Sequence, residues 1–408
     1  MKKLEQRVPN LRFKGFTDDW EQRKLGDVVN FFSGLTYHPS DVKNKGYFVI
    51  RSSNIQNNQI VSADDIFVNK DIINVPNVKQ GDIIVVVRNG SRKLIGKHAQ
   101  VLTDMPNTVI GAFMTGVRSK SNFYINALLD SDQFQKEIYK NLGATINQIT
   151  IGEFRKMRFI ITSGNEAQTI GEFFKKIDTL ITLQQRKLDL LKQLKKGFLQ
   201  KMFADKDSKQ PVLRFKGFHD DWEQRKLGEI SDIKSGLSTN TQSKKNLYKI
   251  TRIETISDGF IDVKKVGTVR EKPDKKFLMN CGDILFSNIN SLKHIGKVAI
   301  FDGSFTLYHG MNLLRITVNT KTSSYFIYYE LSTKKYRNWA KAHANPAVSQ
   351  ASINQSELSL ENMSLTSLAE QEKIVNLLLL LDKLISLQQQ KLAKYQSIKK
   401  SLLQQMFI

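Results

Sequence analysis

The chain has 408 residues, of which 40% are hydrophobic and 25% charged, a composition typical of globular proteins rather than disordered ones. Its 62 lysines and arginines against 39 aspartates and glutamates give a formal net charge of +23. This excess predicts a polyanionic partner: nucleic acid first, with an anionic membrane or a merely basic surface as alternatives. The most apolar stretch, residues 374–387, contains Asp382 and Lys383 and is shorter than the roughly 20 residues of a membrane span. We therefore expect no membrane partner. Because the single cysteine, Cys281, allows no internal disulfide, we also expect a cytoplasmic protein.

The chain begins without the apolar segment of a secretory signal, and a long repeat follows. Residues 11–26, LRFKGFTDDWEQRKLG, return at residues 213–228 with only Thr17 replaced, by His219. A repeat 202 residues apart is far longer than solenoid periods, so each copy is predicted to be a complete module with its own core. We interpret the Asp-Asp doublet before each repeated Trp as a capped turn whose Trp packs on the module, not as a metal site.

The middle part of each copy is rich in Val, Ile, Thr, Asn and Gly and differs between the copies in most residues. Both copies nevertheless carry Gly-Asp before a short apolar run, at residues 81–84 and 282–285, and Ile-Gly-Lys at residues 95–97 and 295–297. Gly-Asp before an apolar run predicts a turn that leads into a strand, and Asn89-Gly90 predicts a hairpin turn. The sequence therefore predicts two divergent, strand-rich domains on a shared frame.

Each copy ends in a predicted long helix, at residues 166–203 and 370–408. Apolar stripes more often pack on their own domain, but more than 35 residues span about 50 Å or more, which one small domain cannot cover. We therefore predict that the helices pack on each other, with Gln184 and Gln388 fixing their register or, alternatively, lying at solvated edges. The predicted seam consists of Ile177, Leu180, Gln184, Leu191, Leu381, Leu384, Gln388 and Tyr395.

A nine-residue linker, residues 204–212, connects the first helix to the second module. So short a connection places the second domain near the far end of the first helix and lets the second helix return along it. The predicted fold class is α/β (α+β), with two variable domains on two long antiparallel helices related by a pseudo-twofold axis. The predicted boundaries are 1–165, 166–203, 204–212, 213–369 and 370–408.

Motifs for catalysis are absent from the sequence. Asn345-Pro346-Ala347-Val348 lacks the second Pro and the aromatic residue of an amino-methyltransferase motif, and residues 90–98 have one residue too many for a phosphate-binding loop. No two histidines have metal-ligand spacing, and one cysteine cannot form a zinc site. We therefore predict a non-catalytic protein with no metal and no cofactor of its own; a self-contained DNA-modifying enzyme is an alternative.

Candidate DNA-reading residues are the polar and basic side chains on predicted loops, because such side chains bind base edges and phosphates. The loops after the two Gly-Asp strands supply Arg88, Asn89, Ser91, Arg92, Lys93, Lys97 and His98, and Ser287, Asn288, Asn290, Lys293, His294 and Lys297. Further candidates are Arg51, Asn54, Asn147, Gln148, Arg252, His309, Asn312, Ser349 and Gln350. The alternative for each is a structural role. A solvated helix face is predicted for Lys192, Lys195, Lys196, Lys399 and Lys400, with contact to DNA or a partner subunit as the alternative.

The order of these motifs resembles that of the specificity subunits of type I restriction-modification systems. WEQRKLG, Ser-Gly, Gly-Asp-Ile, Ile-Gly-Lys and a long helix introduced by Ala-Glu-Gln-Glu-Lys-Ile at residues 369–374 occur in that order, and the plan is given twice. The first copy departs at residues 163–170, which affects the helix cap rather than the fold. The resemblance implies two target-recognition domains and helices that act as a spacer and dock two DNA-adenine methyltransferase subunits, which restriction subunits join. S-adenosylmethionine, ATP and magnesium are then expected on those partners.

From these observations we predict a subunit that reads double-stranded DNA. Because the two variable domains differ, its target is predicted to be bipartite and non-palindromic, with half-sites about one helical turn apart on one DNA face. A coiled-coil scaffold whose charge is incidental is the remaining alternative.

Overall fold

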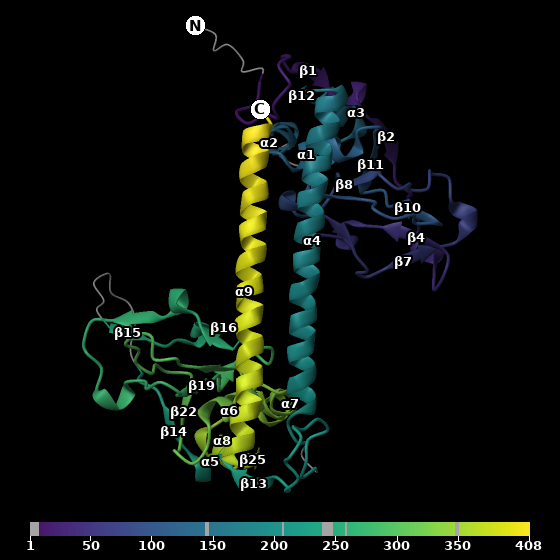
Figure 1. The fold of residues 1–408 in the computed structure, drawn as a ribbon. Helices are drawn as coiled ribbons and strands as arrows, with labels where there is room; N and C mark the ends of the chain where they lie inside the picture. The colour runs from purple at the N-terminus through teal and green to yellow at the C-terminus, as the bar shows by residue number, and fades with distance from the viewer. Residues whose placement is uncertain (1–7, 143–146, 206–207, 239–247, 258, 347–350) are drawn as a thin grey trace. The chain divides into compact units, whose positions relative to one another are not determined.

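The computed structural model describes residues 8–142, 147–205, 208–238, 248–257, 259–346 and 351–408. The chain divides into two compact units: the first unit comprises residues 1–186 and 389–408, and the second unit residues 187–388. Two long helices, α4 (Gly164–Lys201) and α9 (Leu368–Met406), each begin in one unit and end in the other (Figure 1). Each unit therefore contains the first half of one helix and the last half of the other.

Each unit contains its own four-stranded antiparallel sheet, and the strand order is the same in both. In the first unit the strand order is β2 (Asn30–Ser33), β11 (Met114–Arg118), β8 (Ile83–Val86) and β9 (His98–Gln100). In the second unit the same order is β14 (Ser231–Ser235), β22 (Leu314–Val318), β19 (Ile284–Phe286) and β21 (Val298–Ile300). The predicted strands after Gly-Asp are β8 and β19. Both are apolar throughout because both faces of the sheet are covered: Ile83 belongs to the core under the helices and Ile84 to a second cluster.

The smaller sheets differ between the units, as expected for the divergent middles. In the first unit, β10 (Thr108–Ile110) pairs in parallel with β4 (Tyr47–Ile50), followed by β7 (Ile66–Val68) and β3 (Val42–Lys43), and β5 (Ile55–Gln56) pairs with β6 (Gln59–Ile60). In the second unit, β15 (Tyr248–Ile250) pairs with β18 (Gly267–Val269), β16 (Ile256–Ser257) with β17 (Phe260–Ile261), and β24 (Ala351–Ser352) with β20 (Ile289–Asn290) and β23 (Asn345–Pro346).

The shared frame surrounds these sheets. The repeated block forms β1 (Glu21–Lys24) and β13 (Glu223–Lys226), which pair with β12 (Arg158–Ile161) and β25 (Asn362–Leu365), the strands that lead into the long helices. Shorter helices cover one face of each large sheet: α1 (Asn122–Asp130), α2 (Asp132–Asn141) and α3 (Ile151–Lys156) in the first unit, and α5 (Leu227–Ile230), α6 (Ser324–Leu331), α7 (Lys334–His343) and α8 (Gln355–Ser359) in the second.

A buried ion pair ties each repeated block to the start of a long helix. Arg12 Nε lies 2.6 Å from Glu166 Oε1, and Arg214 Nε lies 2.7 Å from Glu370 Oε1. Trp20, like its counterpart in the second copy, is 2% exposed, as predicted, and its Nε1 donates to Glu166. The irregular sequence at the start of the first long helix therefore keeps the glutamate that this contact needs.

The halves of the long helices pack antiparallel within each unit. In the first unit, Lys399 of α9 lies 2.5 Å from Asp178 of α4, and in the second unit Lys195 of α4 lies 2.5 Å from Asp382 of α9. The two pairs occupy equivalent positions of the repeat. Two of the lysines predicted to be solvated therefore hold helices together, and Lys399 is only 8% exposed.

The predicted seam needs one correction. Leu381 and Gln388 are buried, whereas Leu384 is 40% exposed and the neighbouring Ile385 is half-buried in its place. Because Leu384 and Ile385 are both apolar, the sequence allows either residue to continue the apolar face of the helix. The prediction chose Leu384, which was wrong. Gln184, Ile177, Leu180, Leu191 and Tyr395 are half-buried. None of the described helices is long and apolar enough to cross a membrane.

Candidate nucleic-acid interface

Three of the predicted DNA-reading segments converge in the first unit. The loop after β8 pairs with the segment before α3, since Asn89 N donates to Asn147 O over 3.2 Å and Ile149 N to Val87 O over 2.9 Å. Asn89 Nδ2 also donates to Ser52 Oγ, 3.1 Å away, in the turn that follows Arg51. Segments that lie far apart in the sequence thus form one surface.

The loop after β8 is longer than the predicted hairpin turn. It runs from residue 87 to residue 97 and contains a 3-10 turn, Arg92–Leu94. Neither Asn89 nor Gly90 has the positive φ that the predicted turn needs; Gly96 has it instead, with φ 85°. The reason is that Asn89 is held extended by its pairing with the segment before α3. Arg88, Ser91, Arg92 and Lys93 are exposed, and Lys97 and Gln148 are half-buried.

The second unit has a depression of about 690 Å³ at the equivalent place. Five of its lining residues were predicted from sequence: Arg252, Ser287, Asn290, His294 and Lys297. Ile353 N donates to Asn288 O over 2.8 Å, which corresponds to the bond between Ile149 and Val87 in the first unit. Its lining carries three cationic side chains, Arg252, Lys265 and Lys297, and one carboxylate, Glu254, so the depression has a net positive charge. The pKa of His294 is lowered, first by burial and then by the positive charges of Lys297 and Lys293.

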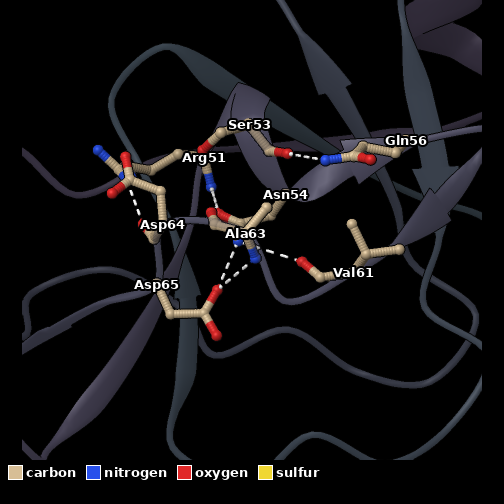
Figure 2. Close-up of polar contacts among 8 residues, drawn as sticks. All are labelled: Arg51, Ser53, Asn54, Gln56, Val61, Ala63, Asp64 and Asp65. Carbon is tan, nitrogen blue, oxygen red and sulfur yellow. Dashed lines mark hydrogen bonds and ion pairs between the residues drawn. The ribbon is translucent and has the colours of Figure 1, made fainter. Parts of the chain in front are cut away.

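Asn54, also predicted to read DNA, instead shapes its own turn (Figure 2). It is completely buried, and its Nδ2 donates to Val61 O, Ala63 O and Asp65 Oδ1, the last over 2.8 Å. Its Oδ1 accepts from Arg51 N over 3.0 Å. Arg51 is partly exposed, and its Nη2 lies 2.8 Å from Asp64 Oδ2. In this arrangement Asn54 fixes the backbone that presents Arg51.

Other predicted residues are also committed to internal contacts. His309 is completely buried, its Nε2 lies 2.9 Å from Leu313 O, and burial lowers its pKa to about 4. Asn288 is 9% exposed and its Nδ2 donates to Ile353 O, while Ser287 lies at the floor of the depression with 1% exposure. Asn312 is half-buried and Lys293 exposed. Ser349 and Gln350 lie outside the described residues.

His98 belongs to a buried charged network rather than to the surface. It is 3% exposed; its Nδ1 donates to Gly96 O over 3.0 Å, and its Nε2 lies 3.4 Å from Asp130 Oδ1. Asp130 in turn lies 2.6 Å from Lys399, which also contacts Asp178. The turn at Gly96, which closes the loop of residues 87–97 (the recognition loop), is thereby connected to the halves of both long helices in the first unit.

This network predicts a pH-dependent stability. Burial alone lowers the pKa of His98, but the hydrogen bond and charge of Asp130 outweigh it and raise the pKa above its ordinary value of about 6.5. A raised pKa stabilises the fold fully at low pH, and this contribution is lost as pH rises through the folded value. The other charges facing His98 are Lys399 and Asp178, which remain ionic partners of each other.

We expect the thermal unfolding temperature of the chain to fall between about pH 6.5 and the raised pKa of His98, and His98→Val to remove this step. Valine is a natural choice, because Val298 occupies the equivalent position in the second unit. His219→Val, at an exposed histidine of the repeated block, is the control. A step of unchanged size in His98→Val would contradict the assignment.

Phe113 was not predicted from the sequence. It is 52% exposed, and the guanidinium carbon of Arg88 lies 4.9 Å from the centroid of its ring. Its neighbours in sequence are those of a buried strand, so no sequence signal marks it. Lys265, which lines the depression of the second unit, was not predicted either, whereas Glu254, also in the lining, follows the predicted Arg252 in the same segment. Among the described residues, no group of three or more His, Cys, Asp or Glu side chains could hold a metal ion.

Comparison with known proteins agrees with the duplicated plan. The profile of the type I restriction modification DNA specificity domain matches residues 17–193 and again residues 219–396. The type I restriction enzyme MjaX specificity subunit of Methanocaldococcus jannaschii is 41% identical over 194 residues, which is 46% of this chain and 46% of that protein. The StySPI specificity subunit of Salmonella potsdam is 25% identical over 378 residues, 88% of this chain and 81% of that protein.

A solved structure has the same fold. The crystal structure of a type I restriction-modification S subunit from M. genitalium superposes with a TM-score of 0.64 at 15% identity, covering 98% of this chain and 99% of the other. The two profile matches together span most of the sequence, and the relatives are named specificity subunits rather than catalytic ones. The chain therefore belongs to the type I restriction-modification DNA specificity family, as a non-catalytic subunit for DNA target recognition.

Proposed function

We propose that each unit reads one half of a bipartite, non-palindromic DNA target in the cytoplasm. One observation supports this most. In the first unit the loop after β8 pairs with the segment before α3, and in the second unit the loop after β19 pairs in the same way with the segment before α8. These segments belong to the middle parts, which differ between the copies in most residues, and the surfaces they form are basic. A frame that is repeated within the chain and carries two different basic surfaces is suited to two different half-sites.

Within each surface, phosphate contacts and base contacts fall to different residues. Exposed Lys and Arg side chains suit phosphates, which carry no sequence information. Arg92 and Lys93 in the first unit and Lys293 in the second are exposed. Arg88, which pairs with the segment before α3 in the first unit, and Asn290, which lines the depression of the second, suit base edges.

The long helices offer surfaces for protein partners. Apolar side chains are exposed at equivalent positions: Leu183 and Ile398 on the helix halves of the first unit, and Leu387 and Leu194 on those of the second. Exposed apolar residues that recur in both copies support two equivalent docking sites, one for each of two methyltransferase subunits. Restriction subunits would join that complex, and S-adenosylmethionine, ATP and magnesium would be bound by the partners rather than by this chain.

The salt dependence of DNA binding tests the phosphate contacts. We expect Arg92→Ala and Lys93→Ala, each in complex with the methyltransferase, to weaken binding to all sequences and to lower the slope of log affinity against log salt by about one. Lys136→Ala, at an exposed lysine of α2, is the control and should leave the slope unchanged. Unchanged slopes in all three variants would remove the recognition loop from the interface, and absence of DNA binding by the intact complex would favour a scaffold.

A further inference from the structure

The turn before β11 displays an aromatic side chain to solvent. Phe113 is 52% exposed, although an exposed ring of this size gains nothing for the fold. The turn itself is firmly held, because the carbonyl of Phe113 accepts hydrogen bonds from Val87 N over 3.0 Å and from Arg88 N over 3.2 Å. Phe113 is therefore fixed at the start of the recognition loop of the first unit.

Arg88 stacks on this ring. Its guanidinium carbon lies 4.9 Å from the ring centroid, and its backbone pairs with Gln148 in the segment before α3. Stacking immobilises a guanidinium while its in-plane N–H donors stay available for a planar acceptor pair. Among the described residues, the Arg88 side chain has no hydrogen-bond acceptor within the chain.

We propose that Arg88 and Phe113 form one stacked reader, in which Arg88 binds O6 and N7 of a guanine and Phe113 contacts the 5-methyl group of a neighbouring thymine. This inference rests on the proposed function and assigns base chemistry to its first half-site. Guanine offers two acceptors in the geometry of an arginine fork, and the thymine methyl is the apolar group of the major groove. A phosphate contact would not use the ring, since an aromatic face gains nothing from an anion.

The second unit lacks this reader. Its backbone pairing places Ile289 at the position of Arg88, and the turn after Gly310 carries Asn312 at the position of Phe113. Neither an arginine nor an aromatic ring is present at these two positions. The reader therefore contributes to one half-site only, which is consistent with an asymmetric target.

The test measures binding of the full chain, in complex with its methyltransferase, to DNA duplexes that carry the sequence this complex methylates. Each thymine of the first half-site is replaced in turn by deoxyuridine, which removes only the methyl group. We expect the wild-type complex to lose about fourfold in affinity at one position, next to a specified guanine. Phe113→Ala should bind the thymine and deoxyuridine duplexes equally.

Variants of Arg88 test the second half of the reader. Arg88→Ala should lose the preference for the adjacent guanine by about 5- to 150-fold, and Arg88→Lys, which keeps the charge but not the fork, should lose most of it as well. Because stacking orients the guanidinium, Phe113→Ala should also reduce the guanine preference. The loss in the double variant of Phe113→Ala and Arg88→Ala should then be smaller than the sum of the losses in the two single variants. Leu102→Ala, at a 57% exposed apolar residue of the same unit, is the matched control.

Three results would overturn the reader. A fourfold methyl preference that persists in Phe113→Ala would show that another group contacts the thymine. Equal affinity of the wild-type complex for the thymine and deoxyuridine duplexes would exclude the methyl contact and leave Phe113 a structural role. An unchanged guanine preference in both Arg88 variants would exclude Arg88. In each case the complex would still bind its target, so the proposed function would stand, whereas a wild-type complex that binds no DNA would refute both.

Discussion

A chain in which residues 229–345 replace residues 27–142 is expected to fold and to direct methylation to an inverted repeat of the second half-site. The junctions lie at equivalent places of the two copies, after the repeated block and after the helices α2 and α7. The exchange keeps the frame strands β1 and β12 and the ion pair between Arg12 and Glu166.

The transplanted segment finds matching contacts in its new place. In the first unit Phe407 of α9 packs against Trp20 and Tyr124, and in the second unit Phe203 of α4 packs against Trp222 and Phe326. Phe326 should therefore pack on Phe407 after the exchange.

The polar contacts should also be replaced. Tyr329 OH donates to Asp382 Oδ2 over 2.8 Å in the second unit, and Asp178 is the equivalent residue in the first. The chain should lose the contact between Asp130 and Lys399 but gain one between Tyr329 and Asp178.

An inverted repeat is expected because the helix halves run antiparallel in each unit, so that equal readers would face equal half-sites on opposite strands. Sequencing of methylated bases in cells that express the exchanged chain with its methyltransferase gives the result directly. The reciprocal exchange should give an inverted repeat of the first half-site. A direct repeat, or the parental asymmetric motif, would contradict the antiparallel arrangement.

Combining Leu183→Asp with Leu387→Asp is expected to abolish assembly with the methyltransferase and, with it, all DNA methylation. Both leucines are exposed, 55% and 51%, and occupy equivalent positions of α4 and α9, so the chain itself should stay folded. An aspartate forced into an apolar interface would lose its hydration without gaining a partner. Each single variant should remove one of two methyltransferase subunits.

Native mass spectrometry of the co-expressed proteins measures the stoichiometry of these complexes. Leu102→Asp, at a similarly exposed residue outside the long helices, is the matched control and should leave assembly intact. A complex of unchanged composition in the double variant would place the methyltransferase subunits elsewhere.

The frame of this protein was predictable because its signals are local. The repeated block, the Gly-Asp turns before β8 and β19 and the long apolar stripes each reflect a rule of chain geometry that acts over a few residues. The same local rule misplaced Leu384, since adjacent apolar residues satisfy two helical frames equally well.

The roles of single polar residues were less predictable, because they depend on distant partners. From the sequence, His98 was predicted to lie on a loop. In the structure it lies next to Asp130, which contacts Lys399, a residue 269 positions away from Asp130. Asn54 is buried by the strand and turn that follow it, which no spacing in the sequence indicates. Phe113 shows the converse: a residue with the pattern of a core strand is exposed because it lies in the turn before β11 rather than in the strand.

Sequencing of methylated bases in cells that express the unmodified chain with its methyltransferase tests the central claim most directly. Two different basic surfaces on equivalent units predict a motif with two specified blocks of unrelated sequence, separated by unspecified bases and modified at both ends. Exchange of residues 27–142 should change one block and leave the other unaltered. A single contiguous motif, a palindrome, or no methylation that depends on this chain would contradict the account.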